Sequence, residues 1–119
     1  MERDIWTYED ESIGDVDLTG YSVEAVDGGI GKIDEATYDV GSSYVVVDTG
    51  PWILGKKVLL PAGVITRVDP QSETVFVRAS KDEIKDSPEY DSDVVLDDSY
   101  RSRVGGYYSG TETYRGSRL

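Results

Sequence analysis

Short extended segments alternate with turn-forming residues through the middle of this chain. Six runs rich in β-branched and aromatic residues cover positions 21–26, 30–38, 44–47, 56–60, 64–68 and 74–78. Clusters of Gly, Pro, Asp and Ser separate these runs, so that a turn signal recurs about every eight to twelve residues. This pattern predicts six short β-strands and an all-β fold class.

Glycine gives two further indications within the first pair of runs. Asp27 and Gly28 stand between the runs, and an Asp-Gly pair there predicts a hairpin because Gly supplies positive φ at no steric cost. Gly31, inside the second run, indicates a bulge or a bend. The segment 28–32 also resembles a phosphate-binding loop, but it lacks the full spacing and the following helix, so a hairpin is the better interpretation.

The strand pattern ends where the periodicity changes. Ser80 and Glu83 have the spacing of a capping box, in which the Ser hydroxyl accepts from the Glu amide and the Glu carboxylate reaches back. A short helix over 81–86 is therefore expected, with Pro88 as its stop and Ile84 as its core residue.

A chain of 119 residues arranges six short strands most economically as a small closed or nearly closed β-barrel, because closure removes exposed sheet edges. The run 44–47 is apolar throughout, which predicts a strand covered on both faces. The expected core consists of apolar strand residues and one helix residue: Val23, Ile33, Val45, Val47, Val58, Leu60, Ile65, Val68, Val75, Val77 and Ile84.

Charge divides the chain into further segments. The sequence holds 24 acidic and 12 basic residues, which gives a net charge of -12. We expect an acidic lead segment over 1–15, a barrel domain over 16–90 and an acidic linker over 91–98. Residues 99–119 are rich in Gly, Ser, Tyr and Arg, a composition that predicts a flexible tail. A body this acidic repels phosphate backbones, which disfavours nucleic acid as its partner.

The chain contains no Cys and no His. This excludes disulfides, thiolate nucleophiles, catalytic triads built on imidazole, and zinc sites with Cys or His ligands. Its apolar runs are far shorter than the roughly 20 residues of a membrane-spanning helix, and its first residues do not have the pattern of a signal peptide. We therefore expect a cytoplasmic protein without membrane insertion.

The connection between the third and fourth runs carries three large apolar residues, Trp52, Ile53 and Leu54. Apolar side chains exposed on such a loop often mark a protein contact. The alternative is that Trp52 folds over an open end of the barrel as a lid. Both interpretations stay open, and the three residues are the contact candidates of this sequence.

Carboxylates suggest a different function. The segment 89–98 holds acids that could collect Ca²⁺ or Mg²⁺, and the neighbours Asp15 and Asp17 or Asp34 and Glu35 could supply a pair for acid–base catalysis. In so acidic a chain these neighbours arise from composition alone, and the spacing of an EF-hand is not met. We therefore assign no catalytic residue, no metal ligand and no cofactor. A carboxylate-only or divalent-cation-dependent enzyme is the alternative function.

The segment 99–119 suggests a third possibility. Its Tyr rings could stack on bases and its Arg side chains could pair with phosphate, which would make the chain an accessory protein for RNA or the ribosome. The same side chains could instead pack onto the acidic body, where Coulomb attraction favours them. We prefer packing or disorder because neither needs a partner.

Residues 18–90 resemble the PRC-barrel domain family. The resemblance rests on the order and spacing of Gly20-Tyr21-Ser22-Val23, Asp27-Gly28-Gly29-Ile30-Gly31-Lys32-Ile33, Tyr44-Val45-Val46-Val47-Asp48, Lys56-Lys57-Val58-Leu59-Leu60-Pro61, Val64-Ile65-Thr66-Arg67-Val68-Asp69 and Lys81-Asp82-Glu83-Ile84-Lys85-Asp86-Ser87-Pro88-Glu89-Tyr90. It implies a small, strongly bent six-stranded β-barrel with one short C-terminal helix, used for binding and assembly without catalytic residues. This chain would be a free-standing, soluble and acidic member of the family.

We therefore expect a non-catalytic interaction module whose partner is itself or another protein. The expected strands carry more apolar faces than one small barrel can cover. This surplus predicts a homodimer.

Overall fold

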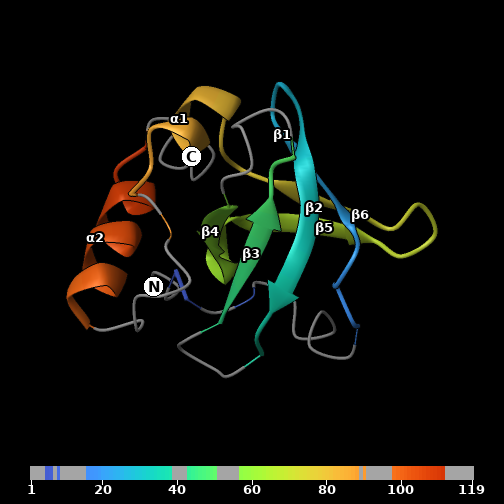
Figure 1. Cartoon of the computed structure of the whole chain (residues 1–119), viewed down its shortest axis with the longest axis horizontal. Helices are drawn as coiled ribbons and strands as arrows, with labels where there is room; N and C mark the ends of the chain where they lie inside the picture. The colour runs from blue at the N-terminus through green and yellow to red at the C-terminus, as the bar shows by residue number, and fades with distance from the viewer. Residues whose placement is uncertain are drawn as a thin grey trace.

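The computed structural model describes residues 5–6, 8, 16–38, 43–50, 57–88, 90 and 98–111. Figure 1 shows a bent sheet with two helices on one side of it. The elements in chain order are β1 (Ser22–Ala25), β2 (Gly28–Ala36), β3 (Tyr44–Asp48), β4 (Lys57–Pro61), the 3-10 helix η2 (Ala62–Val64), β5 (Ile65–Asp69), β6 (Thr74–Val77), α1 (Lys81–Lys85) and α2 (Asp98–Ser109). All six predicted strands are present, and each limit lies within two residues of the expected one.

The six strands form a single mixed sheet in the order β4-β3-β2-β1-β6-β5. Only the pair β1 and β6 is parallel, and the other four neighbouring pairs are antiparallel. Strands β4 and β5 are the two ends of this order, and the three residues of η2 carry the chain directly from one to the other. The described strands thus give an open sheet, and the closure that we expected of a barrel is not shown.

Three register shifts bend the sheet. One extra residue stands in β2 opposite Val23 and Glu24, a second in β2 beyond Ile33, and a third in β5 between Ile65 and Arg67. A bulge increases the local twist of its strand. At the first bulge, Gly31 has a φ of 149° and lies so close to β3 that a Cβ would be 2.1 Å from the Asp48 carbonyl oxygen. The register shift confirms the predicted bulge at Gly31. Only glycine fits this close approach to β3.

The local signals in the two connections, from β1 to β2 and from β6 to α1, are also confirmed. Val26 and Asp27 connect β1 to β2 as a two-residue hairpin loop, since Ala25 pairs with Gly28. Ser80 and Glu83 form the capping box of α1, with the Glu83 amide donating to the Ser80 hydroxyl. Asp27 links the two features, because its carboxylate accepts from the backbone amide of Lys81 at 2.8 Å.

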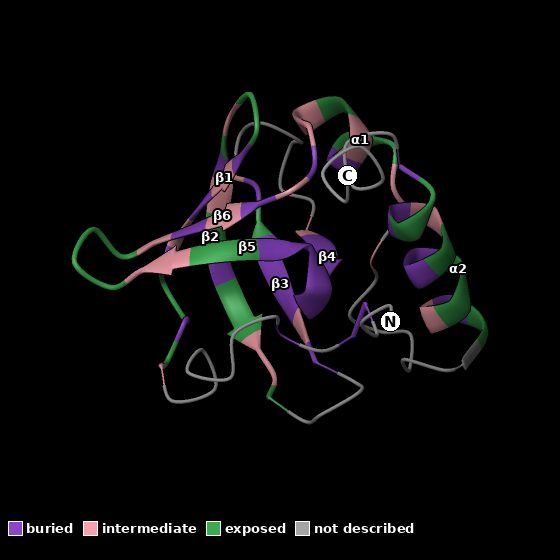
Figure 2. Cartoon of the chain, turned by 180° about the vertical axis from the view of Figure 1, so that it is seen from behind, coloured by how far each residue is buried: buried purple, intermediate pink, exposed green. Residues whose placement is uncertain are grey.

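The expected core is largely correct. Ten of the eleven predicted residues are buried, and Val68 is the exception because it is only partly buried and packs at the margin. The core is larger than we expected, however. It also includes Val46 and Leu59 from the opposite face of β3 and β4, three residues of the N-terminal segment (Ile5, Trp6, Tyr8) and three residues of α2 (Tyr100, Val104, Tyr108). Figure 2 shows these buried stretches on the strands and on α2.

The prediction of a flexible tail over 99–119 is wrong for its first part. Residues 98–109 form α2, a helix of 12 residues, whereas residues 112–119 lie outside the described part. The physical reason is the spacing of Tyr100, Val104 and Tyr108, which repeats every four residues and so lines one helical face. These side chains are at most 6% exposed. Burial of this face outweighs the low helix propensity of the surrounding Gly and Ser.

The N-terminal segment is anchored beside α2 by backbone hydrogen bonds. The Gly63 amide donates to the Ile5 carbonyl at 2.6 Å, and the Ser43 amide donates to the Trp6 carbonyl at 2.8 Å. The Tyr8 hydroxyl donates to the Thr37 carbonyl at 2.7 Å. Of the lead segment 1–15, the described residues are therefore part of the fold. Most of the linker 91–98 lies outside the described residues.

These two terminal segments change the reason for expecting a dimer. The strand over 44–47 is covered on both faces, as predicted, since Val45, Val46 and Val47 are fully buried. The cover comes from the same chain: α2 lies alongside β4 in Figure 1, and both terminal segments join the core. The apolar faces of these strands are thus buried by segments of the same chain, so any self-association must use another surface.

Candidate protein-interaction surface

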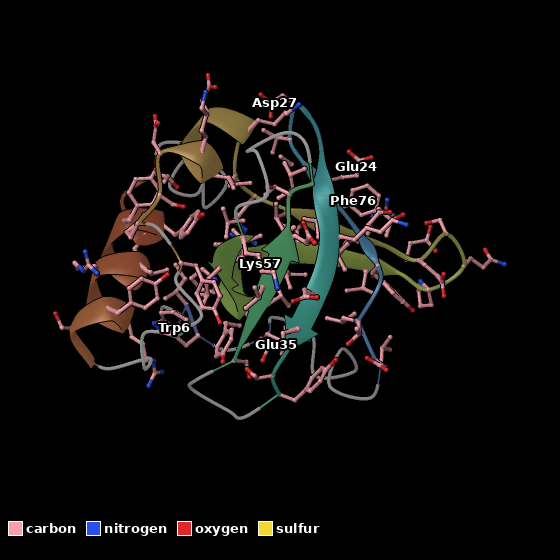
Figure 3. All side chains as sticks on the ribbon, in the orientation of Figure 1. Trp6, Glu24, Asp27, Glu35, Lys57 and Phe76 are labelled. Atoms are coloured by element: carbon pink, nitrogen blue, oxygen red, sulfur yellow. The ribbon has the colours of Figure 1, made fainter. Side chains whose placement is uncertain are left out.

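A row of side chains crosses the face of the sheet that lies away from the helices. Arg67 on β5 pairs with Phe76 on β6, Phe76 pairs with Glu24 on β1, and Glu24 pairs with Gly29 on β2. Paired residues on neighbouring strands point to the same face. We call Arg67, Phe76 and Glu24 the outer row. Figure 3 shows Glu24 and Phe76 projecting together from the side opposite the helices.

Alternation along the strands explains why these residues face outward. Val75 and Val77 are buried, so Phe76 between them points to the opposite face, and Val23 and Ala25 place Glu24 outward in the same way.

Arg67 joins the row because of the bulge in β5. From Ile65 opposite Val77, a regular ladder would place Thr66 opposite Phe76 and turn Arg67 inward. The extra residue moves Arg67 opposite Phe76 instead, on the outward side.

The outer row combines an aromatic ring with one charge of each sign. The Arg67 guanidinium carbon lies 4.2 Å from the centre of the Phe76 ring, which is a cation–π contact. Phe76 and Glu24 are half-buried, and Arg67 is exposed. Glu24 extends over Gly29, where a Cβ would lie 3.6 Å from its Oε2 atom. Aromatic and Arg side chains are the types enriched at protein interfaces.

A second row, two residues further along the strands, is polar. Its members in sheet order are Asp69, Thr74, Ser22, Lys32 and Asp48. The Asp69 carboxylate accepts from the amide of Gln71 at 3.0 Å. Its hydrogen bonds with Ser72 are the main cause that lowers the pKa of Asp69. This polar row borders the outer row and sets its limit.

Two large apolar side chains elsewhere on the described surface are exposed. Val26 at the tip of the β1–β2 hairpin is 61% exposed, and Tyr38 is 37% exposed. The Tyr38 hydroxyl is engaged, because it donates to the Val16 carbonyl and accepts from the Leu18 amide. Phe76 is therefore the best-supported aromatic anchor on the described surface.

The contact candidates Trp52, Ile53 and Leu54 lie outside the described residues. The residues on either side of them are described: Asp48 pairs with Lys57 at the end of the β3–β4 hairpin, and the Gly50 amide donates to the Asp48 carboxylate. Lys57 also forms an ion pair of 2.7 Å with Asp34. The hydrogen bond to Asp34 and its negative charge raise the pKa of Lys57. The described residues on either side of the predicted contact loop thus include the charged side chains of Asp48 and Lys57.

The acid pairs considered for catalysis are not brought together into a site within the described residues. Asp34 pairs with Lys57, and the Asp17 carboxylate accepts from the Thr19 amide. That backbone hydrogen bond lowers the pKa of Asp17. Among the described residues no group of three or more acids is placed to hold a metal ion. Asp15 and almost all of the acidic stretch 89–98 fall outside them.

The aromatic residues considered for RNA stacking are largely used inside the molecule. Tyr100 and Tyr108 are buried, and the Tyr107 hydroxyl donates to the Glu83 carbonyl of α1. The Arg103 guanidinium lies 5.5 Å from the centre of the Tyr100 ring. The described half of this segment therefore packs onto the body, which was the alternative to RNA binding.

Comparison of the sequence with protein-family models finds no match, and comparison with curated proteins finds none either. None of the helices in the described residues is long and apolar enough to cross a membrane.

Proposed function

We propose that this chain is a non-catalytic protein-interaction module of the PRC-barrel type, and that it associates with a second copy of itself. The observation that carries the proposal is the outer row, in which Phe76 and Arg67 form an aromatic–cation pair on the outward face of an otherwise polar sheet surface. Aromatic and Arg side chains are enriched at protein interfaces, and Arg is enriched among the residues that dominate the binding energy. Trp52, Ile53 and Leu54 are a second contact candidate within the same proposal.

The family assignment is part of the proposal. The resemblance implies a strongly bent six-stranded sheet with one short helix, and the three bulges and the capped helix that follows β6 agree with it. In this proposal the bent sheet is the barrel of that family, with η2 carrying the chain from β4 to β5. A hydrogen bond of 2.8 Å from the Arg78 amide to the Val64 carbonyl draws this turn against the end of β6. Closure predicts slow amide exchange along the outer edge of β5, and fast exchange there would contradict it.

Sedimentation velocity across the micromolar range tests self-association. The proposal expects the mass to rise from that of one chain to that of two with increasing concentration. Because each copy carries a net charge of -12, association should strengthen between about 0.1 M and about 1 M salt, where the screening length falls from roughly 10 Å to 3 Å.

The matched variants are Phe76→Ser and Val26→Ser. Each removes an apolar side chain from the outside of the molecule, but only Phe76 belongs to the outer row. Phe76→Ser should weaken association at least about tenfold, and Val26→Ser should leave it unchanged. A single-chain mass at every concentration and salt would remove the proposal, and equal behaviour of the two variants would remove the outer row as the contact. Circular dichroism confirms that both variants fold.

A further inference from the structure

The charges of the outer row lie on opposite sides of its aromatic residue. Phe76 is on β6, Arg67 is on β5 to one side, and Glu24 is on β1 to the other. Neighbouring strands are spaced by about 4.8 Å, so each charged side chain projects from a strand about that distance from the strand that carries the ring. The pattern is positive, aromatic, negative.

We infer that two copies meet face to face across this row, on a two-fold axis that runs parallel to β6 between the two Phe76 rings. This inference rests on the proposed self-association and names its geometry. A two-fold interface brings residue i against residue j and residue j against residue i. Here Arg67 of each copy pairs with Glu24 of the second copy, and the two rings meet at the centre.

The charge pattern selects this axis over the other in-plane choice. A two-fold axis parallel to the row would bring Arg67 against Arg67 and Glu24 against Glu24. Like charges opposed across an interface are disfavoured, whereas the axis along β6 brings unlike charges together.

The polar row is compatible with the same axis. The rotation brings Asp69 opposite Ser22 of the second copy and Thr74 opposite Thr74, so no like charges meet there. Gly29 continues the outer row beyond Glu24, and its lack of a side chain leaves room for the Glu24 carboxylate. Arg78 follows the end of β6, and its Nε atom is buried inside its own copy.

Charge reversal provides the test, because the geometry predicts a mixed dimer. In a dimer of Arg67→Glu, the acids at positions 67 and 24 would oppose each other in both pairs. In a dimer of Glu24→Arg, arginines would oppose each other at the same positions. Each variant alone should associate at least about tenfold more weakly than the unaltered chain. In an equimolar mixture, the glutamates of one variant face the arginines of the other at both pairs of positions. The mixture and the double variant Arg67→Glu/Glu24→Arg should both recover the original dissociation constant to within about threefold.

Lys32→Glu is the matched control, because it makes the same charge change on the same outward face without facing a charge across the axis. It should weaken association much less than Arg67→Glu. Sedimentation velocity on the separate and mixed variants supplies the readout, and circular dichroism confirms their folding. Failure of the mixture and of the double variant to recover would overturn this geometry while self-association itself stands. A single-chain mass for the unaltered protein would instead remove the proposed function, and this geometry with it.

Discussion

The guanidinium carbon of Arg101 lies 5.1 Å from the centre of the Trp6 ring and so joins helix α2 to the N-terminal segment. Trp6 also packs against Gly105 of the same helix, where a Cβ would come within 3.0 Å of its Nε1 atom. Two segments from distant parts of the sequence thus form one layer. This layer completes the core next to β3 and β4.

Replacing Trp6 by Ala should lower the free energy of unfolding by about 3 kcal/mol, because a large side chain only 8% exposed is removed from this layer. The control is Arg101→Gln, which removes the cation but leaves the ring, and should cost no more than about 1 kcal/mol. Urea denaturation followed by circular dichroism measures both. Equal losses would mean that the ring contributes nothing beyond the cation contact.

The adjacent glycines of α2 should respond in opposite directions to alanine. Gly106 is exposed, with nothing within 4 Å of an added Cβ, so Gly106→Ala should raise stability by about 1 kcal/mol through helix propensity. Gly105→Ala gains the same propensity but pushes the Trp6 indole, so its net effect should be a loss. Thermal unfolding of the two variants measures both changes in stability. A stabilised Gly105→Ala would show that Trp6 does not pack as described.

A Cβ at Gly31 should be more damaging than any change in α2. The position combines a φ of 149° with the approach of 2.1 Å to the Asp48 carbonyl oxygen. We expect Gly31→Ala to cost at least about 4 kcal/mol or to prevent folding, because the β2–β3 ladder must part. Gly20→Ala is the control, since Gly20 has a φ of 88° but open space around it. It should cost only about 1 kcal/mol, the strain of the backbone alone.

The strands and α1 could be predicted because their signals are local. The Asp27-Gly28 turn, the bulge at Gly31 and the capping box of Ser80 and Glu83 each depend on residues adjacent in sequence. The order of the strands depends on contacts between distant residues. The parallel pairing of β1 with β6 therefore had no local signal, and neither did the open ends at β4 and β5.

Helix α2 and the outer row were missed for different reasons. The spacing of Tyr100, Val104 and Tyr108 was present in the sequence, but the Gly, Ser and Arg residues around it suggested disorder. Phe76 could have been found, because it stands between the inward residues Val75 and Val77. Its pairing with Arg67 could not, since the bulge in β5 that brings them together has no glycine or other local mark.

Buried tyrosines should make the fold sensitive to alkali. Burial raises the pKa of Tyr100 to about 12 and raises the pKa values of Tyr8 and Tyr108 further. In the unfolded chain these groups ionise near pH 10. Their contribution to stability is therefore complete below about pH 10 and is lost as the pH rises towards the folded pKa values, because the folded state then holds more protons than the unfolded state.

A spectrophotometric titration checks this expectation. Tyrosinate absorbance should rise in two stages, the second coinciding with loss of the circular dichroism signal. Tyr100→Phe should reduce the dependence of the unfolding free energy on pH above about pH 10. Ionisation of all nine tyrosines in one step with the secondary structure intact would contradict the expectation.

Helix α2 is translated after every strand of the sheet whose core it completes. While a ribosome is still elongating the chain, β3 and β4 therefore exist before the layer that covers them is complete. A nascent polypeptide that stalls before Tyr100 would present the uncovered apolar surface to the cell's chaperones and proteases. Burial of the core next to β4 consequently waits for the synthesis of α2, however early the hairpins themselves can form.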